Sequence, residues 1–264
     1  MVHITLSEWA FSPGRNYYHL FVNCVRHLVH YMKIHHLTKK ETYFVIPSQI
    51  IKTAYPFFKD VLTYFVQIME PNDMITPIVI GVKKYCDYQT MYDMLWKLQS
   101  PSKPNKRIVY IKRKGRRYVI NNDACIEVLK TLYQKKYDIV VAQFEELSVK
   151  QQIDLMSSCI LLVGCHGAGC SNTYFMKSDS ILFELFPESF YIDCFKKICD
   201  VRSIRHFYMN GTSSRSPPIT LEYYMKNLHC PQVNTPVLRA SIRDIPFTIN
   251  VEDFSKKLRA LLPV

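Results

Sequence analysis

Long apolar runs are missing from this sequence. The most apolar stretches, such as residues 139–142 and 160–163, fall far short of the ~20 residues that a membrane-spanning helix needs. Residues 1–11 also lack the basic start and apolar centre of a secretory signal. We therefore expect a cytoplasmic protein with no membrane span.

Cysteine pairs of the Cys-x-x-Cys type are absent, although the chain contains nine cysteines. The odd number, with several cysteines inside apolar runs, favours reduced and mostly buried thiols over a disulfide framework. Cys165 and Cys170 flank a glycine-rich loop that contains His166, but the second half of a zinc-ligand set is missing. We expect neither a metal ion nor another cofactor.

Acidic residues are outnumbered, 22 against 34 lysines and arginines, which gives a formal net charge of +12. Such a charge indicates an anionic partner, which could be a nucleic acid, a membrane surface or a phosphorylated small molecule. Many of the basic residues crowd into residues 103–117, where a solvated basic edge is the plain alternative. Nucleic acid ranks last, because Tyr110 and Tyr118 alone could stack bases there.

The order of apolar segments predicts an α/β protein of two domains. With 264 residues and 48% apolar content the chain can bury a core, and the turn residues at 100–105 are the best linker. We therefore place one domain at residues 1–100 and a second at 106–250, and expect the helix at 251–262 to pack back on the first.

Strands alternating with helices favour parallel sheets covered on both faces. In the first domain we expect helices at 17–36, 55–69 and 89–98 and strands at 43–46 and 77–82. In the second we expect strands at 107–113, 138–144, 160–163 and 181–186, helices at 123–135, 149–157 and 190–201, a short helix near 172–176, and an irregular tail from 217 to 244.

A buried strand that runs into the glycine-rich turn at residues 164–169 is the strongest local signal. Such a turn exposes backbone N–H groups, and these suit a phosphate or diphosphate. The turn has neither the Lys-Ser/Thr ending of a P-loop nor the Gly-x-Gly-x-x-Gly spacing of a dinucleotide site, and close packing alone could explain it. His166 follows the strand, at the end where open α/β sheets bind ligands.

Two further segments belong at the same sheet edge. Arg113 and Arg117 follow the first strand after the linker, and the planar fork of arginine suits a bidentate phosphate contact. Glu184 lies near the end of the strand at 181–186, where a carboxylate can accept hydrogen bonds from ribose hydroxyls. A buried glutamate paired with an arginine is the alternative for Glu184.

Taken together, these segments resemble glycosyltransferase family 61 in their order and spacing. The family has an Arg-x-x-x-Arg-x-x-x-Asn segment, a Leu-Ser-x-x-x-Gln stretch, a strand that ends in His-Gly-Ala, a Glu-Leu-x-Pro strand end, and Asn-x-x-His near the amino terminus. The corresponding residues here are Arg113, Arg117 and Asn121, then Leu147, Ser148 and Gln152, then His166, Gly167 and Ala168, then Glu184 and Pro187, and Asn16 and His19. The resemblance covers roughly residues 14–200.

The resemblance implies a GT-B arrangement, in which two Rossmann-like domains face a cleft and the carboxy-terminal one binds a nucleotide sugar. Arg113 and Arg117 would neutralise the diphosphate, the turn at Gly167, Ala168 and Gly169 would support it, and Glu184 would contact the ribose or base. Asn121 and His166 join this donor site. The family implies inversion at the sugar without a metal, and the sequence contains no Asp-x-Asp of the kind that holds manganese. The expected donor is a UDP-sugar, with UDP-N-acetylglucosamine or UDP-xylose favoured, and the acceptor a hydroxyl of a protein or glycan.

The acceptor side is less complete in this chain. An inverting displacement needs a base near the acceptor hydroxyl, and His19, beside Asn16, is the candidate. Many family members carry an acidic residue four positions after that histidine, whereas this chain has Asn23. Either another residue serves as base, or the chain is an inactive scaffold that keeps the fold. His19 could also be a partly buried helix histidine.

Overall fold

The computed structural model describes residues 2–6, 25–45, 62, 67–69, 78–80, 107–188, 190–215, 220–227 and 243–264. The chain divides into two compact units. The first comprises Met1–Pro101 and Leu147–Asp154, and the second comprises Ser102–Glu146 and Leu155–Val264. No helix in these described ranges is long and apolar enough to cross a bilayer.

The first unit contains a parallel sheet of four strands in the order β3-β2-β1-β4. Its elements are β1 (Val2–Leu6), α3 (Arg26–Ile34), β2 (Thr42–Val45), β3 (Gln67–Met69) and β4 (Ile78–Ile80). Leu28, Val29 and Met32 are buried apolar positions of α3, at the spacing of one helix face, and His27 is buried as well. Two expectations are corrected: β1 is a strand that the sequence did not indicate, and residues 67–69 pair with β2 instead of ending a helix.

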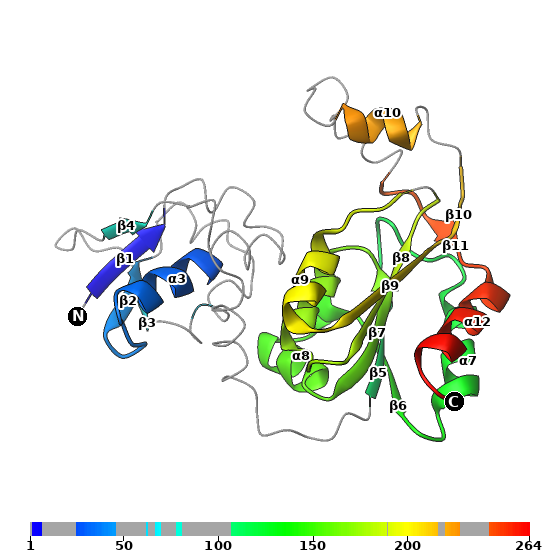
Figure 1. Ribbon diagram of the computed structural model, residues 1–264, viewed down its shortest axis with the longest axis horizontal. Helices are drawn as coiled ribbons and strands as arrows, with labels where there is room; N and C mark the ends of the chain where they lie inside the picture. The colour runs from blue at the N-terminus through cyan, green and yellow to red at the C-terminus, as the bar shows by residue number, and fades with distance from the viewer. Residues whose placement is uncertain are drawn as a thin grey trace. The chain divides into compact units, whose positions relative to one another are not determined.

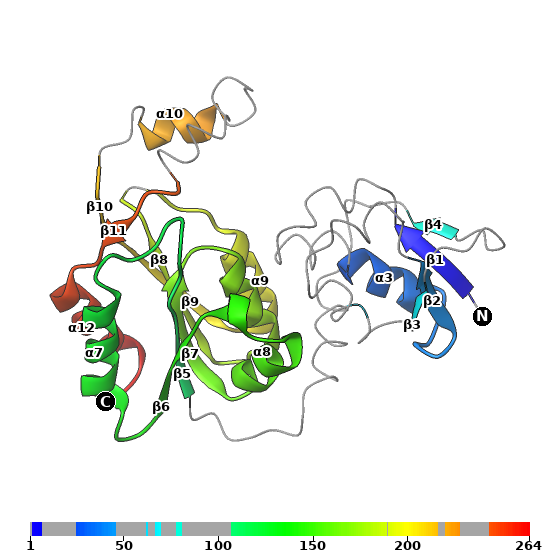
Figure 2. The ribbon, with the colours of Figure 1, turned by 180° about the vertical axis from the view of Figure 1, so that it is seen from behind.

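The second unit is built on a five-stranded parallel sheet in the order β6-β5-β7-β8-β9. Figures 1 and 2 show α7 and α12 against one face of this sheet and α9 against the other. The strands are β5 (Arg107–Ile111), β6 (Asp138–Ala142), β7 (Cys159–Cys165), β8 (Ile181–Phe186) and β9 (Arg205–Asn210). The helices are α7 (Asn122–Tyr133), η2 (Phe144–Glu146), η3 (Ala168–Phe175), α9 (Cys194–Arg202), α10 (Leu221–Lys226) and α12 (Val251–Leu261), and β10 (Thr212–Ser213) pairs with β11 (Phe247–Thr248). Helix α8 (Val149–Met156) follows η2 in the chain, and most of it belongs to the first unit.

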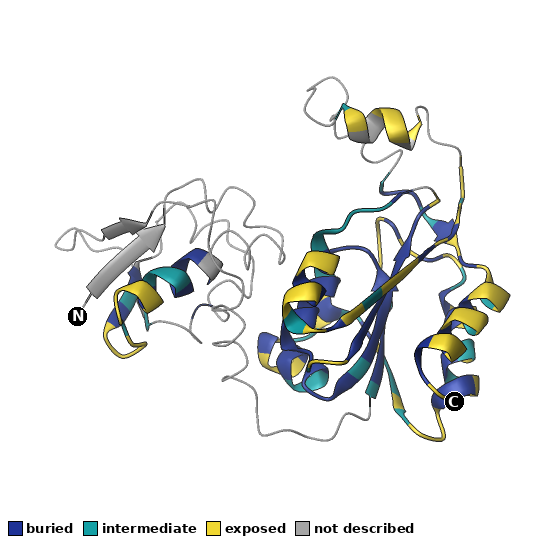
Figure 3. Cartoon of the chain, in the orientation of Figure 1, coloured by how far each residue is buried: buried dark blue, intermediate teal, exposed yellow. Residues whose placement is uncertain are grey.

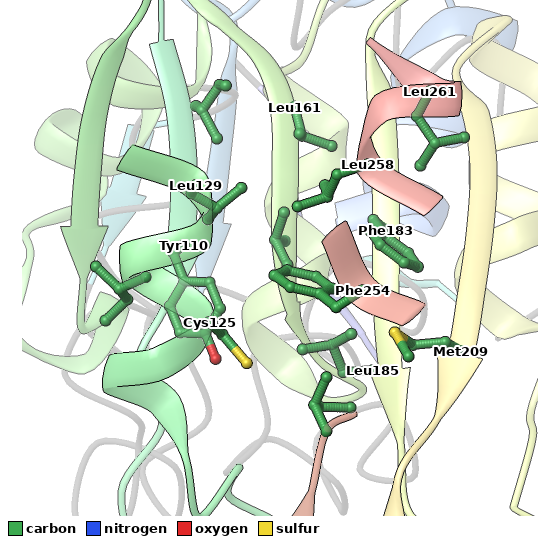
Figure 4. Close-up of a cluster of buried hydrophobic side chains, with 14 of the residues drawn as sticks. Tyr110, Cys125, Leu129, Leu161, Phe183, Leu185, Met209, Phe254, Leu258 and Leu261 are labelled. Carbon is green, nitrogen blue, oxygen red and sulfur yellow. The ribbon is translucent and has the colours of Figure 1, made fainter. Parts of the chain in front are cut away.

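Because successive side chains of a strand point to opposite faces, each face of the sheet is covered by a different set of residues. Every residue of β8 is buried, so its odd and even positions line two different cores. Phe183 and Leu185 join the core formed with α7 and α12 (Figure 4). Glu184 lies between them in the strand and therefore faces the other side of the sheet. Figure 3 shows the same contrast at larger scale, with buried central strands and exposed outer helix surfaces.

The last helix belongs to the second unit, which corrects the expectation that it packs back on the first. Phe254 and Leu258 of α12 are fully buried, and the Phe254 ring lies 5.7 Å from that of Phe183. Tyr133 of α7 donates its hydroxyl hydrogen bond to the carbonyls of Leu258 (2.7 Å) and Leu262 (3.0 Å). The apolar stripe of α12 thus finds its partner within the carboxy-terminal sheet.

β9 was not expected from the sequence. Its residues are mostly exposed and Met209 alone is buried, so no apolar run marks it. Backbone pairing with β8 along its whole length makes it an edge strand. Helix α10 and the short pair β10 and β11 also lie in or beside residues that were expected to be irregular.

Candidate functional site

The order of strands reverses direction between β5 and β7. From β5 the chain passes to β6 at one edge, and from β7 it passes through β8 to β9 at the other. Open parallel sheets bind ligands at the carboxyl ends of the two strands that flank such a switch point. The residues that follow β5 include Arg113 and Arg117, and those that follow β7 begin with His166 and Gly167. The two strongest sequence signals are therefore neighbours at the expected place.

Arg113 connects these two loops. Its Nη1 donates to the carbonyl oxygen of His166 at 3.3 Å. A β-carbon on Gly167 would overlap the Arg113 guanidinium, so this approach requires glycine. Gly167 also precedes η3, whose first N–H groups have no acceptor within the helix. A guanidinium and the start of a short helix thus meet at the turn formed by Gly167, Ala168 and Gly169.

Arg117 is a buried cation. It is 7% exposed, adopts a left-handed backbone conformation with φ of 55°, and its Nη2 lies 3.3 Å from Oδ1 of Asp244. Its buried Nε has no hydrogen-bond partner among the described residues. Burial, and then the charge of Arg113, lowers the pKa of Arg117 to about 10, although Asp244 acts in the opposite direction. The side chain is still protonated at neutral pH, but its charge is incompletely balanced.

Asp244 and Arg243 were missed by the sequence analysis, which treated the tail up to residue 244 as irregular. Asp244 is 8% exposed and receives Arg116 (3.8 Å), Arg117 (3.3 Å) and Arg243 (3.3 Å). One carboxylate cannot neutralise this many guanidiniums. The alternating apolar residues Ile245, Phe247 and Ile249, all of which are buried, were the signal in the sequence for an extended, anchored segment.

Asn121 holds that segment in place. Its Nδ2 donates to the carbonyl of Ile249 (2.8 Å), and its Oδ1 accepts from the Ile249 N–H (2.9 Å). Both ends of the amide thus bind backbone, and the expected contact of Asn121 with the donor stays a prediction. Its role is to fix the chain beside the arginine loop.

Glu184 lies between two histidines. Its Oε1 is 2.8 Å from Nδ1 of His166, and its Oε2 is 2.7 Å from Nε2 of His206 on β9. The residue has no exposed surface. Burial acts to raise the pKa of Glu184, but the hydrogen bonds from both histidines outweigh it and lower the pKa below its ordinary value. The carboxylate is therefore ionised and acts as an acceptor only.

This geometry favours a positioning role for Glu184, because a fully buried carboxylate with both oxygens engaged orients its partners. Its expected contact with a ribose or base stays a prediction. The arginine pairing considered as an alternative is wrong, since the partners are histidines. His206 was missed because it lies on the unexpected strand β9.

His166 has the most exposed side chain of this group, 8% against 4% for His206 and none for Glu184. Burial lowers the pKa of His166, opposed by Glu184, and the charges of Arg117 and Arg243 lower it further. The neutral ring donates from Nδ1 to Glu184, which leaves a lone pair on Nε2. The ring stacks on Phe186 at a centroid distance of 4.9 Å, so its plane is fixed.

Other expectations have different outcomes. Asn16, His19 and Asn23 lie outside the described residues. Of the described cysteines, Cys194 is half-buried and the others are buried, and all are free thiols. Within the part of the chain that the structure describes, no three His, Cys, Asp or Glu side chains gather as a metal site would need.

Comparison with known proteins identifies the family of this chain. The family model described as Glycosyltransferase 61 matches residues 17–183. The EGF domain-specific O-linked N-acetylglucosamine transferase of Drosophila melanogaster is 29% identical over 140 residues, which are 50% of this chain and 26% of that protein. The Gallus gallus protein of the same name is 26% identical over 80 residues, 29% of this chain and 15% of its own length. The matched residues thus span about a quarter or less of these relatives, while the family model covers well over half of this chain: the chain belongs to the glycosyltransferase 61 family.

Proposed function

We propose that this chain is a glycosyltransferase that binds a UDP-sugar at the switch point of its second sheet and transfers the sugar to a hydroxyl of a protein or glycan. The observation that carries the proposal is the buried, incompletely balanced positive charge of Arg117 beside Arg113 and the Gly167 turn. A nucleoside diphosphate is the leaving group of such a transfer. Fixed guanidiniums stabilise the negative charge that develops on it.

In this proposal, transfer occurs with inversion and without a metal ion. Arg113 and Arg117 bind the diphosphate oxygens, and the first N–H groups of η3 contribute further donors. The buried site strengthens these contacts because water screens them less. The protein thus supplies positive charge from its own side chains.

His166 takes the hydroxyl contact that the sequence assigned to Glu184. Its Nε2 carries a lone pair, so it accepts a hydrogen bond from a ribose or sugar hydroxyl, while Glu184 and Phe186 hold the ring still. Glu184 and His206 are positioning residues in this scheme. Glu184 supports the hydroxyl contact indirectly, through its hydrogen bond to His166.

The acceptor and the base belong, in the same proposal, to the first unit, in a GT-B arrangement with His19 and Asn16 on the acceptor side. The relatives' names point to N-acetylglucosamine as the sugar and to a protein as the acceptor. UDP-N-acetylglucosamine is therefore the first donor to test, and UDP-xylose the second.

A calorimetric titration without added metal tests the donor site. UDP, UDP-N-acetylglucosamine, UDP-xylose, GDP-mannose and ATP are titrated into wild type, Arg117→Ala and, as an exposed control on α12, Arg259→Ala. We expect wild type and Arg259→Ala to bind UDP and UDP-sugars selectively. Arg117→Ala should bind them at least tenfold more weakly, because a hydrogen bond to a charged group contributes roughly 1.5–3 kcal/mol. Equal binding by all three proteins would refute the assignment.

A non-catalytic scaffold is the second candidate, favoured by Asn23 in place of an acidic residue. It predicts nucleotide binding without turnover. Release of UDP from UDP-N-acetylglucosamine in the presence of folded EGF domains decides between the two. Sustained turnover by wild type, abolished in Arg117→Ala, would exclude the scaffold.

A further inference from the structure

The geometry points to a third arginine in the donor site, supplied by the carboxy-terminal segment 243–250, which we call the strap. We propose that Arg243 contacts the diphosphate directly and that Asp244 is a positioning residue that holds Arg117 and Arg243 toward it. This inference rests on the proposed function. It concerns residues beyond 17–183, the part that the family model matches.

The strap is firmly anchored beside the arginine loop. Phe247 exchanges backbone hydrogen bonds with Tyr118 (3.2 Å) and Ile120 (2.8 Å), and Ile249 is held by Asn121. Ile245, Phe247 and Ile249 are at most 1% exposed. The Arg117 N–H also donates to the carbonyl of Asp244 at 3.1 Å. The start of the strap is therefore fixed at the arginine loop by backbone contacts.

The charge of Arg243 acts on both loops. It contributes to the lowered pKa of Arg117 and to the lowered pKa of His166, while its Nε lies 3.3 Å from Oδ1 of Asp244. Arg116, Arg117 and Arg243 thus lie at one carboxylate, and the charge of Arg113 acts on Arg117 as well, which leaves an excess of positive charge. A diphosphate supplies the missing negative charge.

Arg243 is also free to bind. Its side chain is 32% exposed, whereas that of Asp244 is 5% exposed. Its contact with Asp244 uses Nε at 3.3 Å, and within the described ranges its two Nη groups have no acceptor. A guanidinium that is fixed at Nε and open at both Nη groups suits a bidentate phosphate contact.

Calorimetric titration of inorganic pyrophosphate, UDP and uridine into the full chain tests the role of Arg243. The variants are Arg243→Gln and, as a control with the same change on exposed β9, Arg205→Gln. We expect Arg243→Gln to weaken binding of pyrophosphate and UDP about tenfold or more, with an unchanged melting temperature, and Arg205→Gln to bind like wild type. Wild-type affinity in Arg243→Gln would overturn the inference. Pyrophosphate binding that depends on Arg243, without any binding of UDP-sugars, would support the anion site and refute the proposed function instead.

Asp244→Asn separates positioning from charge. Removal of a negative charge beside an anion site would by itself tighten pyrophosphate binding. If Asp244 positions Arg117 and Arg243, the same change weakens binding, because the guanidiniums lose their common acceptor. Tighter binding in a variant that melts like wild type would overturn the positioning role, and circular dichroism confirms that the variant is folded.

Discussion

Gly167 and Gly164 lie three residues apart, but a side chain on each would meet a different neighbour. On Gly167 a β-carbon would overlap the far end of Arg113, which can swing away. On Gly164 it would lie 2.8 Å from Cβ of Ile111, which is fixed in β5. Glycine at position 167 therefore makes room for Arg113, whereas glycine at position 164 makes room for the packing of Ile111.

Substitution of the two glycines should show this separation. We expect Gly167→Ala to displace Arg113 and to weaken UDP binding about tenfold or more, with little loss of stability. We expect Gly164→Ala to lower the free energy of unfolding by about 1–3 kcal/mol through overpacking, with UDP affinity retained in the folded fraction. Denaturant titration and calorimetry measure both quantities. The opposite assignment of effects would show that Arg113 does not bind the donor.

The pH dependence of stability reports on His166. Because its pKa is lowered in the folded state from the ordinary 6.5, protonation favours unfolding. The stabilisation is complete above pH 6.5 and is lost as the pH falls through the lowered folded pKa. His166→Asn, whose amide can still donate to Glu184, should remove this slope of up to about 1.4 kcal/mol per pH unit. Identical slopes for wild type and variant in chemical denaturation below pH 6.5 would contradict the assignment.

At the scale of elements, two asparagines have different tasks: Asn121 lies beside the strap, and Asn250 is its last residue. Asn121 holds Ile249 by two hydrogen bonds, and Asn250 caps α12 by accepting from the Asp253 N–H at 3.0 Å. Asn121→Ala leaves two backbone groups without partners and should cost about 1–3 kcal/mol. Asn250→Ala should cost about 1 kcal/mol through the lost cap.

The two variants should differ in ligand binding. Loss of the Asn121 contacts releases the strap that carries Arg243, so we expect weaker pyrophosphate binding in Asn121→Ala. The cap of α12 lies beyond the strap's anchors, so Asn250→Ala should bind like wild type. Calorimetry at matched folded fractions makes the comparison. Equal affinities in both would show that the strap does not shape the site.

The elements also show which features of a sequence predict structure. Continuous apolar runs marked β7 and β8 closely, and the helix expected at 149–157 is α8, before which the Oγ of Ser148 accepts from the Gln151 N–H at 3.3 Å. β9 escaped because an edge strand is defined by backbone pairing with β8, which leaves no apolar pattern. Arg243 escaped for a similar reason, since its position depends on long-range anchors at Asn121 and Phe247.

At the scale of the second unit, two groups of basic residues differ in how far their charge is balanced by carboxylates. Arg107, Lys112 and Lys114 are paired with Asp138, Asp123 and Glu146 at the surface, where such pairs contribute little. The arginines around Asp244 keep an excess of positive charge in a buried setting. The unbalanced positive charge is thus concentrated around Asp244, which favours a small phosphorylated ligand over a nucleic acid.

The two units should divide the reaction between them. Every described residue of the candidate site lies within 102–264, and the core between the sheet, α7 and α12 is complete in that range. We expect a fragment of residues 102–264 to unfold cooperatively and to bind UDP, but to transfer no sugar, because His19 and the proposed acceptor side belong to the first unit. Arg117→Ala in the fragment should abolish UDP binding, which serves as the control. A fragment that glycosylates an acceptor would place the acceptor site and base within residues 102–264, and a folded fragment that does not bind UDP would show that the donor site needs residues 1–101.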